Sequence, residues 1–142
     1  MKGFTLIEIL LSMALISIIA GMGVPVYQSF QNRNSLDLAV EGFAQSLRRA
    51  QALARAVDGD TSWGAYIAPG AITLFQGLSF ASRDVGFDEL FDISSSISIT
   101  GLQEVVFLKF SGKPQSIGAT ILTSPNNETR TITINTEGAI EY

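Results

Sequence analysis

The chain contains no cysteine and no histidine among its 142 residues. Without cysteine, no disulfide can hold the fold and no thiol can act as a nucleophile. Without histidine, the most common general base and the most common metal ligand are both missing. The sequence also contains no glycine-rich phosphate loop and no serine–base–acid arrangement. We therefore expect a protein that is not an enzyme and that has no cofactor.

Charged residues are scarce as well. They make up 15% of the chain, whereas hydrophobic residues make up 46%, a composition too apolar for a disordered protein. The length suits one domain with an appendage. Much of the apolar excess precedes Tyr27, so the remainder has the composition of an ordinary soluble domain.

A long apolar run occupies residues 9–27, interrupted by Ser12 and Ser17. As a helix it would span about 28 Å, close to the hydrocarbon thickness of a bilayer. Lys2 is the only positively charged side chain before Gln31. The positive-inside rule then places the N-terminus in the cytoplasm and exports everything after the run.

Glu8 helps to distinguish three interpretations of this segment. A cleaved secretory signal would need a shorter apolar stretch and a small-residue cleavage site, which residues 17–20 fit only loosely. A plain membrane anchor gives no reason for an acid that costs about 2.5–3.5 kcal/mol to place in hydrocarbon. The third interpretation is a resemblance, and it gives the acid a partner.

Residues 3–8, Gly-Phe-Thr-Leu-Ile-Glu, resemble the leader-cleavage motif of type IV prepilins and pseudopilins. The resemblance implies that a prepilin peptidase cuts after Gly3 and that the new N-terminal residue, Phe4, is methylated. It also implies that Glu8 pairs with the terminal amine of a neighbouring pilin or pseudopilin during assembly. Cleavage would indeed create an ammonium on Phe4, a counter-charge for a carboxylate in lipid.

The weakest part of the first helix lies at residues 21–25. Gly21 and Gly23 each cost about 1 kcal/mol relative to alanine, and Pro25 costs about 3 kcal/mol inside a helix. Kinking tolerated by the membrane is one interpretation. The resemblance favours another, local melting when the helix leaves lipid and packs into a filament core.

Residues 28–57 carry an amphipathic pattern. The apolar positions alternate in steps of four and three, which predicts a helix continuous with the membrane segment and packed on the following sheet. A coiled coil is the alternative, although alanines would make its seam thin. We expect the helix to end at residues 58–60, with Gly59 in the role of the glycine that follows a helix terminus. The apolar positions are Leu36, Val40, Phe43, Leu47, Ala50, Ala54 and Val57.

Residues 58–142 have the pattern of a β-rich head with six or seven strands, which gives an α+β fold class with a long N-terminal helix on an antiparallel sheet. A hairpin is predicted for residues 63–75, and a central, most buried strand for 105–110. Residues 77–92 are expected to form a long connection. The predicted organisation is a leader at 1–3, a transmembrane and filament-core helix at 4–27, an amphipathic helix at 28–57 and the head at 58–142.

Three segments carry a second, looser resemblance. Residues 46–54, 63–67 and 131–138 are similar to minor pseudopilins of the GspH/FimT type. With the N-terminal motif, the resemblance extends over the whole chain.

Two acidic groups could serve as sites. Asp58 and Asp60 could begin a calcium loop, but they lack its downstream carboxylate, and a helix-ending turn explains them. Asp84, Asp88, Glu89 and Asp92 form an acidic cluster, which indicates a solvated loop or, as the alternative, a partner or ion contact.

The charge of the head bears on nucleic acid, because some FimT-like relatives are associated with DNA uptake. Four basic and ten acidic residues from Asp58 onward give the head a net charge of −6. This field opposes phosphate binding, so we expect no nucleic-acid partner.

The sequence therefore predicts a non-enzymatic structural subunit of a type IV pilus or type II secretion pseudopilus. Its partners would be prepilin peptidase, other pilins or pseudopilins, and the inner membrane, with the head in the periplasm or on a surface filament. The alternatives are a membrane-anchored ligand- or DNA-binding domain that is not built into a filament, and an anchored enzyme.

Overall fold

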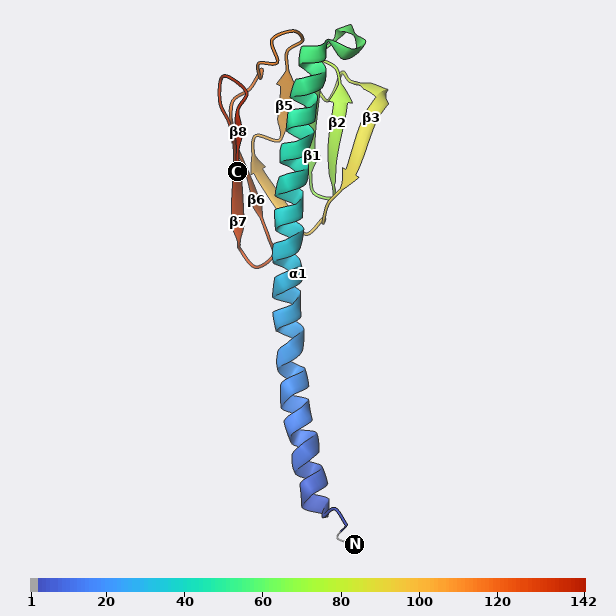
Figure 1. Cartoon of the computed structure of the whole chain (residues 1–142), viewed down its shortest axis with the longest axis vertical. Coiled ribbons are helices and arrows are strands. Elements are labelled where there is room, and N and C mark those ends of the chain that lie inside the picture. The colour runs from blue at the N-terminus through green and yellow to red at the C-terminus, as the bar shows by residue number, and fades with distance from the viewer. Residues whose placement is uncertain (1–2) are drawn as a thin grey trace.

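One helix forms the axis of the molecule (Figure 1). The computed structural model describes residues 3–142, with only the backbone of residues 22–25, so Met1 and Lys2 of the predicted leader lie outside it. Helix α1 runs unbroken over Leu6–Ala56, about 75 Å at 1.5 Å per residue. Its N-terminal half projects away from the head, and its C-terminal half packs against the strands. The predicted continuity of the two helical segments is confirmed.

The helix ends in a left-handed residue, but that residue is not the expected glycine. Val57 has φ 58° and ψ 33°, and its amide donates to the Ala54 carbonyl. A β-branched residue is rarely found in this conformation. Gly59 lies two residues further on, inside the short 3-10 turn η1, Asp58–Asp60. The position of the helix end was thus predicted correctly. The prediction that Gly59 would be the residue that ends the helix was wrong, because Val57 takes the left-handed conformation there.

The head consists of two four-stranded antiparallel sheets. The first has the order β3-β2-β1-β5 and the second the order β4-β6-β7-β8. The predicted α+β class, with a long helix on antiparallel strands, is confirmed. The strands are β1 Trp63–Ala68, β2 Ala71–Gln76, β3 Asp84–Asp92, β4 Ser98–Gly101, β5 Glu104–Phe107, β6 Gly118–Thr123, β7 Thr129–Ile134 and β8 Ile140–Glu141.

Two strand predictions were wrong. The expected long connection contains β3, which pairs with β2 in antiparallel register and has mostly exposed side chains. The expected central strand is shorter and lies last in the strand order of its sheet, as β5. Helix α1 contacts this strand, and the chain after it pairs with its other edge through the Phe107–Pro114 bridge and the Gln115 amide, which donates to the Val106 carbonyl at 2.8 Å. The β1–β2 hairpin was predicted correctly.

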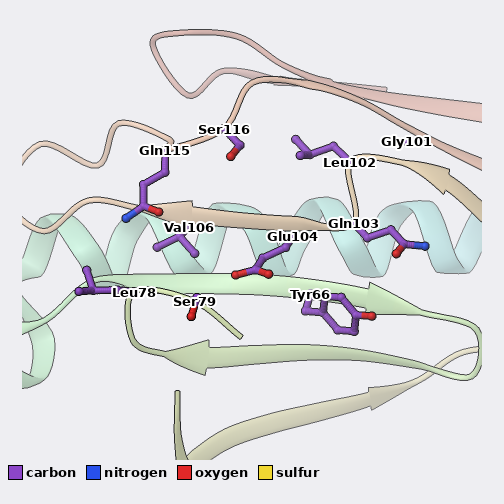
Figure 2. A pocket seen from close by; sticks show the side chains of 10 residues that line it. All are labelled: Tyr66, Leu78, Ser79, Gly101, Leu102, Gln103, Glu104, Val106, Gln115 and Ser116. Carbon is purple, nitrogen blue, oxygen red and sulfur yellow. The ribbon is translucent and has the colours of Figure 1, made fainter. Parts of the chain in front are cut away.

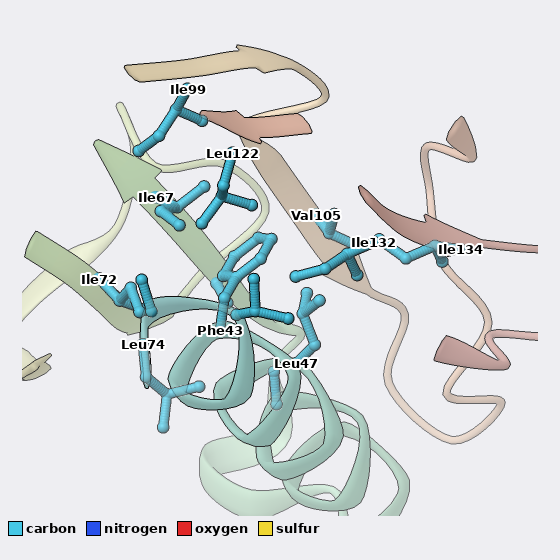
Figure 3. Packing of buried hydrophobic residues seen from close by; sticks show 14 of the residues in the cluster. Phe43, Leu47, Ile67, Ile72, Leu74, Ile99, Val105, Leu122, Ile132 and Ile134 are labelled. Atoms are coloured by element: carbon cyan, nitrogen blue, oxygen red, sulfur yellow. The ribbon is translucent and has the colours of Figure 1, made fainter. Parts of the chain in front are cut away.

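The core lies between α1 and both sheets (Figure 3). Phe43 and Leu47 of the helix point toward Val105 of the first sheet and Ile132 of the second, and all four are fully buried. Of the seven stripe positions, six are buried and Val57 is half-buried. The apolar period of 3.6 residues therefore matches the face that the two sheets cover, and the coiled-coil alternative does not describe this face.

An aromatic cluster covers the outer face of the first sheet. Phe80, in the loop after β2, stacks on Tyr66 with ring centroids 4.1 Å apart and meets Phe75 edge-on at 5.6 Å. The Phe80 amide donates to the Glu104 carboxylate at 2.8 Å. The loop is therefore folded back onto the sheet.

Candidate membrane and assembly helix

The first part of α1 exposes apolar side chains on every side. Phe4 is 79% exposed, and Leu36 is the first fully buried residue among those helix residues whose side chains the structure describes. By length and composition, α1 is the one helix in the described part of the chain that could cross a membrane. A helix that is apolar all round needs lipid or other helices around it. The exposed large apolar residues are Phe4, Leu6, Ile7, Ile9, Leu10, Leu11, Met13, Leu15, Ile16, Ile18, Ile19, Val26, Tyr27 and Phe30.

Glu8 lies in the first turn of this helix and turns back toward its own N-terminus. A Glu8 carboxylate oxygen is 3.5 Å from the Thr5 amide, at the outer limit of a hydrogen bond. The positive end of the helix dipole also favours an anion here. Within a single chain the carboxylate thus has only weak compensation, and it can accept further hydrogen bonds.

The two serines in the apolar run are satisfied inside the helix. The Ser12 hydroxyl donates to the Glu8 carbonyl at 2.7 Å, and the Ser17 hydroxyl donates to the Met13 carbonyl at 2.8 Å. Such bonds to the preceding turn remove the need for an outside partner. The serines therefore do not prevent this segment from lying in lipid.

The backbone stays helical through the segment that the sequence marks as weak. A side chain added at Gly21 would meet no other atom within 4 Å. The surroundings of Gly23 and Pro25 lie outside the described residues. Local melting of this segment stays a prediction.

A set of polar contacts fixes α1 where it enters the head. Arg33 donates two hydrogen bonds to Glu128, at 3.0 and 2.8 Å, and the Asn32 amide donates to Asn126 at 3.1 Å. The hydrogen bond from Arg33 lowers the pKa of the Glu128 carboxyl, and the same bond raises the pKa of the guanidinium. These contacts hold the β6–β7 turn against the helix.

The acidic cluster does not converge on one site. Asp88 pairs with Arg83 at 2.8 Å, and Glu89 pairs with Arg49 of α1 at 2.6 Å. In the other acidic group, Asp60 pairs with Lys109 at 3.1 Å. Across residues 3–142, no group of three or more acids is arranged to hold a metal ion.

A groove of about 500 Å³ runs over the outer face of the first sheet (Figure 2). Tyr66 of β1 and Glu104 of β5 form part of its floor, and Leu102 and Gln115 come from the loops beside it. One Glu104 oxygen is already bonded to the Phe80 amide. The lining of the groove combines apolar side chains with amide, hydroxyl and carboxylate groups.

The structure places the residues singled out by the sequence in two groups. Gly3 and Phe4 directly precede α1, and Glu8 lies in its first turn, so the three residues lie together at the N-terminal end of the helix. Gly21 lies about 20 Å further along the helix, at 1.5 Å per residue. The Arg33–Glu128 pair could not be predicted, because its partners are 95 positions apart and no local pattern links them. Strand β3 was not predicted either, although Val85 and Phe87 alternate with the period of a strand.

Two comparisons with known proteins agree with this arrangement. The family described as "Prokaryotic N-terminal methylation motif" matches residues 1–24. The structure is similar to that of the minor pseudopilin EpsH from the type 2 secretion system of Vibrio cholerae, with a TM-score of 0.54 and 12% identity. That match covers 75% of this chain and 94% of the other. No curated protein matches the sequence.

The motif lies on the exposed apolar part of α1, and the fold is shared with a pseudopilin. An N-terminal methylation motif therefore occurs in this chain together with the fold of a known minor pseudopilin.

Proposed function

We propose that the protein is a minor pilin or pseudopilin of the GspH/FimT type, a structural subunit of a type IV pilus or type II secretion pseudopilus. Prepilin peptidase removes residues 1–3, and Phe4 is methylated. Residues 4–27 hold the subunit in the inner membrane with the N-terminus in the cytoplasm, and later form part of the filament core. Residues 28–57 carry the exported head, residues 58–142.

One observation carries this proposal. Glu8 is the only charged side chain between Phe4 and Asn32, and it lies on a helix whose apolar side chains are exposed all round. A segment that served only as an anchor would be better inserted without it. A carboxylate in the first turn therefore points to a cationic partner, which no described side chain of the uncleaved chain supplies.

The terminal ammonium of a cleaved neighbour is a suitable partner. Cleavage after Gly3 would leave the new ammonium on Phe4, next to Thr5, whose amide makes the weak contact with Glu8. In a row of parallel helices, displaced along their axes, the carboxylate of one chain can reach the ammonium of another. The attraction is strong at low dielectric, so this pair would set the register between subunits.

The weak helical segment at residues 21–25 has a role when the subunit enters the filament. Gly21, Gly23 and Pro25 lower the cost of opening a few turns when the helix passes from lipid into a filament. The head beyond them keeps its own core and its polar contacts to α1. The helix can thus change locally while the head stays intact.

The head itself has the character of a contact domain. Its net charge of −6 opposes binding to nucleic acid, and each of its four basic residues already forms an ion pair. We therefore propose no enzymatic activity, no cofactor and no nucleic-acid ligand for this subunit.

Replacing Glu8 with leucine tests the proposal. Loss of one partner of a buried ion pair typically costs about 3–5 kcal/mol, enough to keep a subunit out of a filament. We expect Glu8→Leu protein to accumulate in the membrane at normal levels and to be depleted at least tenfold from sheared filaments. Glu41→Leu, at an exposed acid on the head half of α1, is the matched control and should be incorporated normally.

The N-terminal peptide of each variant must be sequenced by mass spectrometry, because uncut protein would also fail to assemble. Normal incorporation of correctly cleaved Glu8→Leu protein would contradict the pairing. Absence of the unaltered chain from sheared filaments would instead favour a membrane-anchored domain outside any filament.

A further inference from the structure

The head reaches furthest toward the exposed half of α1 at the turn between β6 and β7 (Figure 1). This turn comprises residues 124–128, and two contacts fix its level along the helix. Asn126 accepts a hydrogen bond from the Asn32 amide at 3.1 Å, and Glu128 accepts two hydrogen bonds from Arg33. The turn therefore lies beside residues 32–33 of α1.

The apolar run places the membrane surface close to this turn. A helix crosses about 30 Å of hydrocarbon in about 20 residues, so a span that begins at Ile9 ends near Gln28. The headgroup layer adds about 5–8 Å on each side, which corresponds to about four or five further residues. The layer therefore extends to Asn32 and Arg33, the residues that hold the turn. This step rests on the proposed function, in which residues 4–27 cross the membrane.

The exposed side chains on this part of α1 suit a membrane surface. Tyr27 is 70% exposed, and tyrosine is enriched where hydrocarbon meets the headgroups. Phe30 is 69% exposed, although it lies only three residues before the charged Arg33. A hollow of about 150 Å³ between the helix and the turn is lined by Ser29, Phe30, Arg33 and Glu128. The hollow thus combines an apolar ring with hydrogen-bonding groups, as the boundary between lipid and water requires.

The charge on this side of the head does not oppose contact with lipid. The first four residues of the turn carry no charge, and Glu128 is paired with Arg33. Arg130, the next charged residue along the chain, is paired with Asp37 of α1 at 3.0 Å. The net charge of −6 therefore resides elsewhere on the head. The exposed amide of Asn127 can hydrogen-bond to phosphate and ester oxygens.

We propose that the β6–β7 turn rests on the headgroup layer of the membrane and that lipid headgroups fill the hollow beside Phe30. Because the contact is polar and neutral, it should form with zwitterionic lipid and need no anionic lipid. The contact is one-sided, because the first sheet ends further from the membrane. Ile72, two residues from the β1–β2 turn, lies close to Gly42, which is ten positions beyond Asn32. The membrane thus supports the head beneath the second sheet, and this contact must be released when the subunit enters a filament.

Single fluorescent labels test the contact, because the chain has no cysteine of its own. The full chain is labelled at one introduced cysteine at a time and reconstituted in phosphatidylcholine vesicles. Nitroxide quenchers are carried either on the lipid headgroup or on the acyl chain. The four exposed positions are Pro125→Cys in the β6–β7 turn, Pro69→Cys in the β1–β2 turn, Ser111→Cys at the far end of the head and Ser17→Cys in the apolar run.

We expect headgroup nitroxides to quench the label at position 125 at least fivefold more than the label at position 111. The far label should be out of reach, because the Phe110 amide donates to the Ala54 carbonyl, which lies about 33 Å beyond Asn32 at 1.5 Å per residue. Position 69 is the matched control, since it is also an exposed proline in a turn, and its quenching should fall between the other two. Replacing part of the lipid with phosphatidylglycerol should leave these ratios unchanged.

The label at position 17 separates failure of this inference from failure of the proposed function. Strong quenching of that label by acyl-chain nitroxides, with equal headgroup quenching at positions 125 and 111, would show that the helix spans the membrane while the head stands clear of it. Stronger quenching at position 69 than at position 125 would place the wrong sheet on the membrane. Quenching at position 125 only with anionic lipid would contradict the neutral contact. Each of these three results would overturn the inference, whereas no quenching at position 17 would refute the membrane span itself and the contact with it.

Discussion

The Arg33 guanidinium on α1 donates two hydrogen bonds to the Glu128 carboxylate in the β6–β7 turn, at 3.0 and 2.8 Å. This pair lies one turn before Leu36, the first residue that α1 buries in the head. It therefore joins the helix to the second sheet where the exposed and packed halves meet.

This pair should make the stability of the head depend on pH. The pKa of Glu128 is lowered from about 4.5 in the folded chain, so its stabilising effect is complete above that value. The stabilisation by the Arg33–Glu128 pair should decrease as the pH falls below 4.5, because Glu128 of the unfolded chain is protonated first. It should vanish once the pH is below the lowered pKa of Glu128 in the folded chain.

We expect Glu128→Gln to lower the melting temperature at pH 7, and the difference from the unaltered protein to disappear in acid. The effect should be small, because both side chains are partly exposed. Glu141→Gln, at an exposed acid, should show no such difference at either pH. A difference that grows in acid would contradict the assigned direction.

The packing of α1 against both sheets predicts a large loss of stability when Phe43 is truncated. Phe43 is fully buried, and Phe43→Ala should cost about 3–5 kcal/mol. Phe30→Ala, at a position 69% exposed on the same helix, should change stability by less than about 0.5 kcal/mol. Urea unfolding of the full chain in detergent, followed by fluorescence of the buried Trp63, measures both. Equal effects would mean that the stripe does not form the core.

Gly64 should not tolerate a methyl group. A Cβ atom there would lie 2.5 Å from Cζ of Phe75 and 2.9 Å from the Val105 carbonyl oxygen. Gly64→Ala should therefore destabilise the head by about 1–3 kcal/mol and disturb the near-ultraviolet circular dichroism of the aromatic cluster. Gly86→Ala, on the exposed strand β3, adds a Cβ whose nearest neighbour, an Asp84 oxygen, is 3.3 Å away. It should leave both signals close to those of the unaltered protein.

The mature chain should begin at Phe4 and carry one methyl group on its amine. Gly3 and Phe4 precede the start of α1, and Phe4 is 79% exposed, so the peptide bond between them is accessible. Mass spectrometry of the N-terminal peptide from purified membranes measures this directly. A chain that starts at Met1 or at Gly21 would point to an uncut anchor or an ordinary signal peptide.

The helix could be predicted from the sequence because its signal is local and repeated. The stripe from Leu36 to Ala54 specifies the buried face by itself, and the turn at residues 68–70 specifies the β1–β2 hairpin. Strand β3 was missed because an open edge needs no buried face, so its acids looked like a loop. Strand β5 looked central because its side chains are buried on both faces, although it lies last in the strand order of its sheet.

Some residues of the candidate site could be predicted from a local motif, and others could not. Gly3, Phe4 and Glu8 lie within six residues and form a motif that a sequence displays directly. The pairs Arg33–Glu128 and Arg49–Glu89 join positions 95 and 40 apart. These pairs form only when the two sheets pack on α1, and the local spacing of residues does not specify that packing.

The contact between α1 and β7 also sets an order of events during synthesis. The helix is made before the strands, and Ile132 and Ile134, which help to cover Phe43 and Leu47, follow Phe43 by about 90 positions. Until the final strands arrive, the apolar stripe of the helix has no complete cover. The head should therefore fold late and cooperatively, once strand β7 has been made. A chain interrupted before residue 129 would keep an exposed apolar helix face, which chaperones and proteases can recognise.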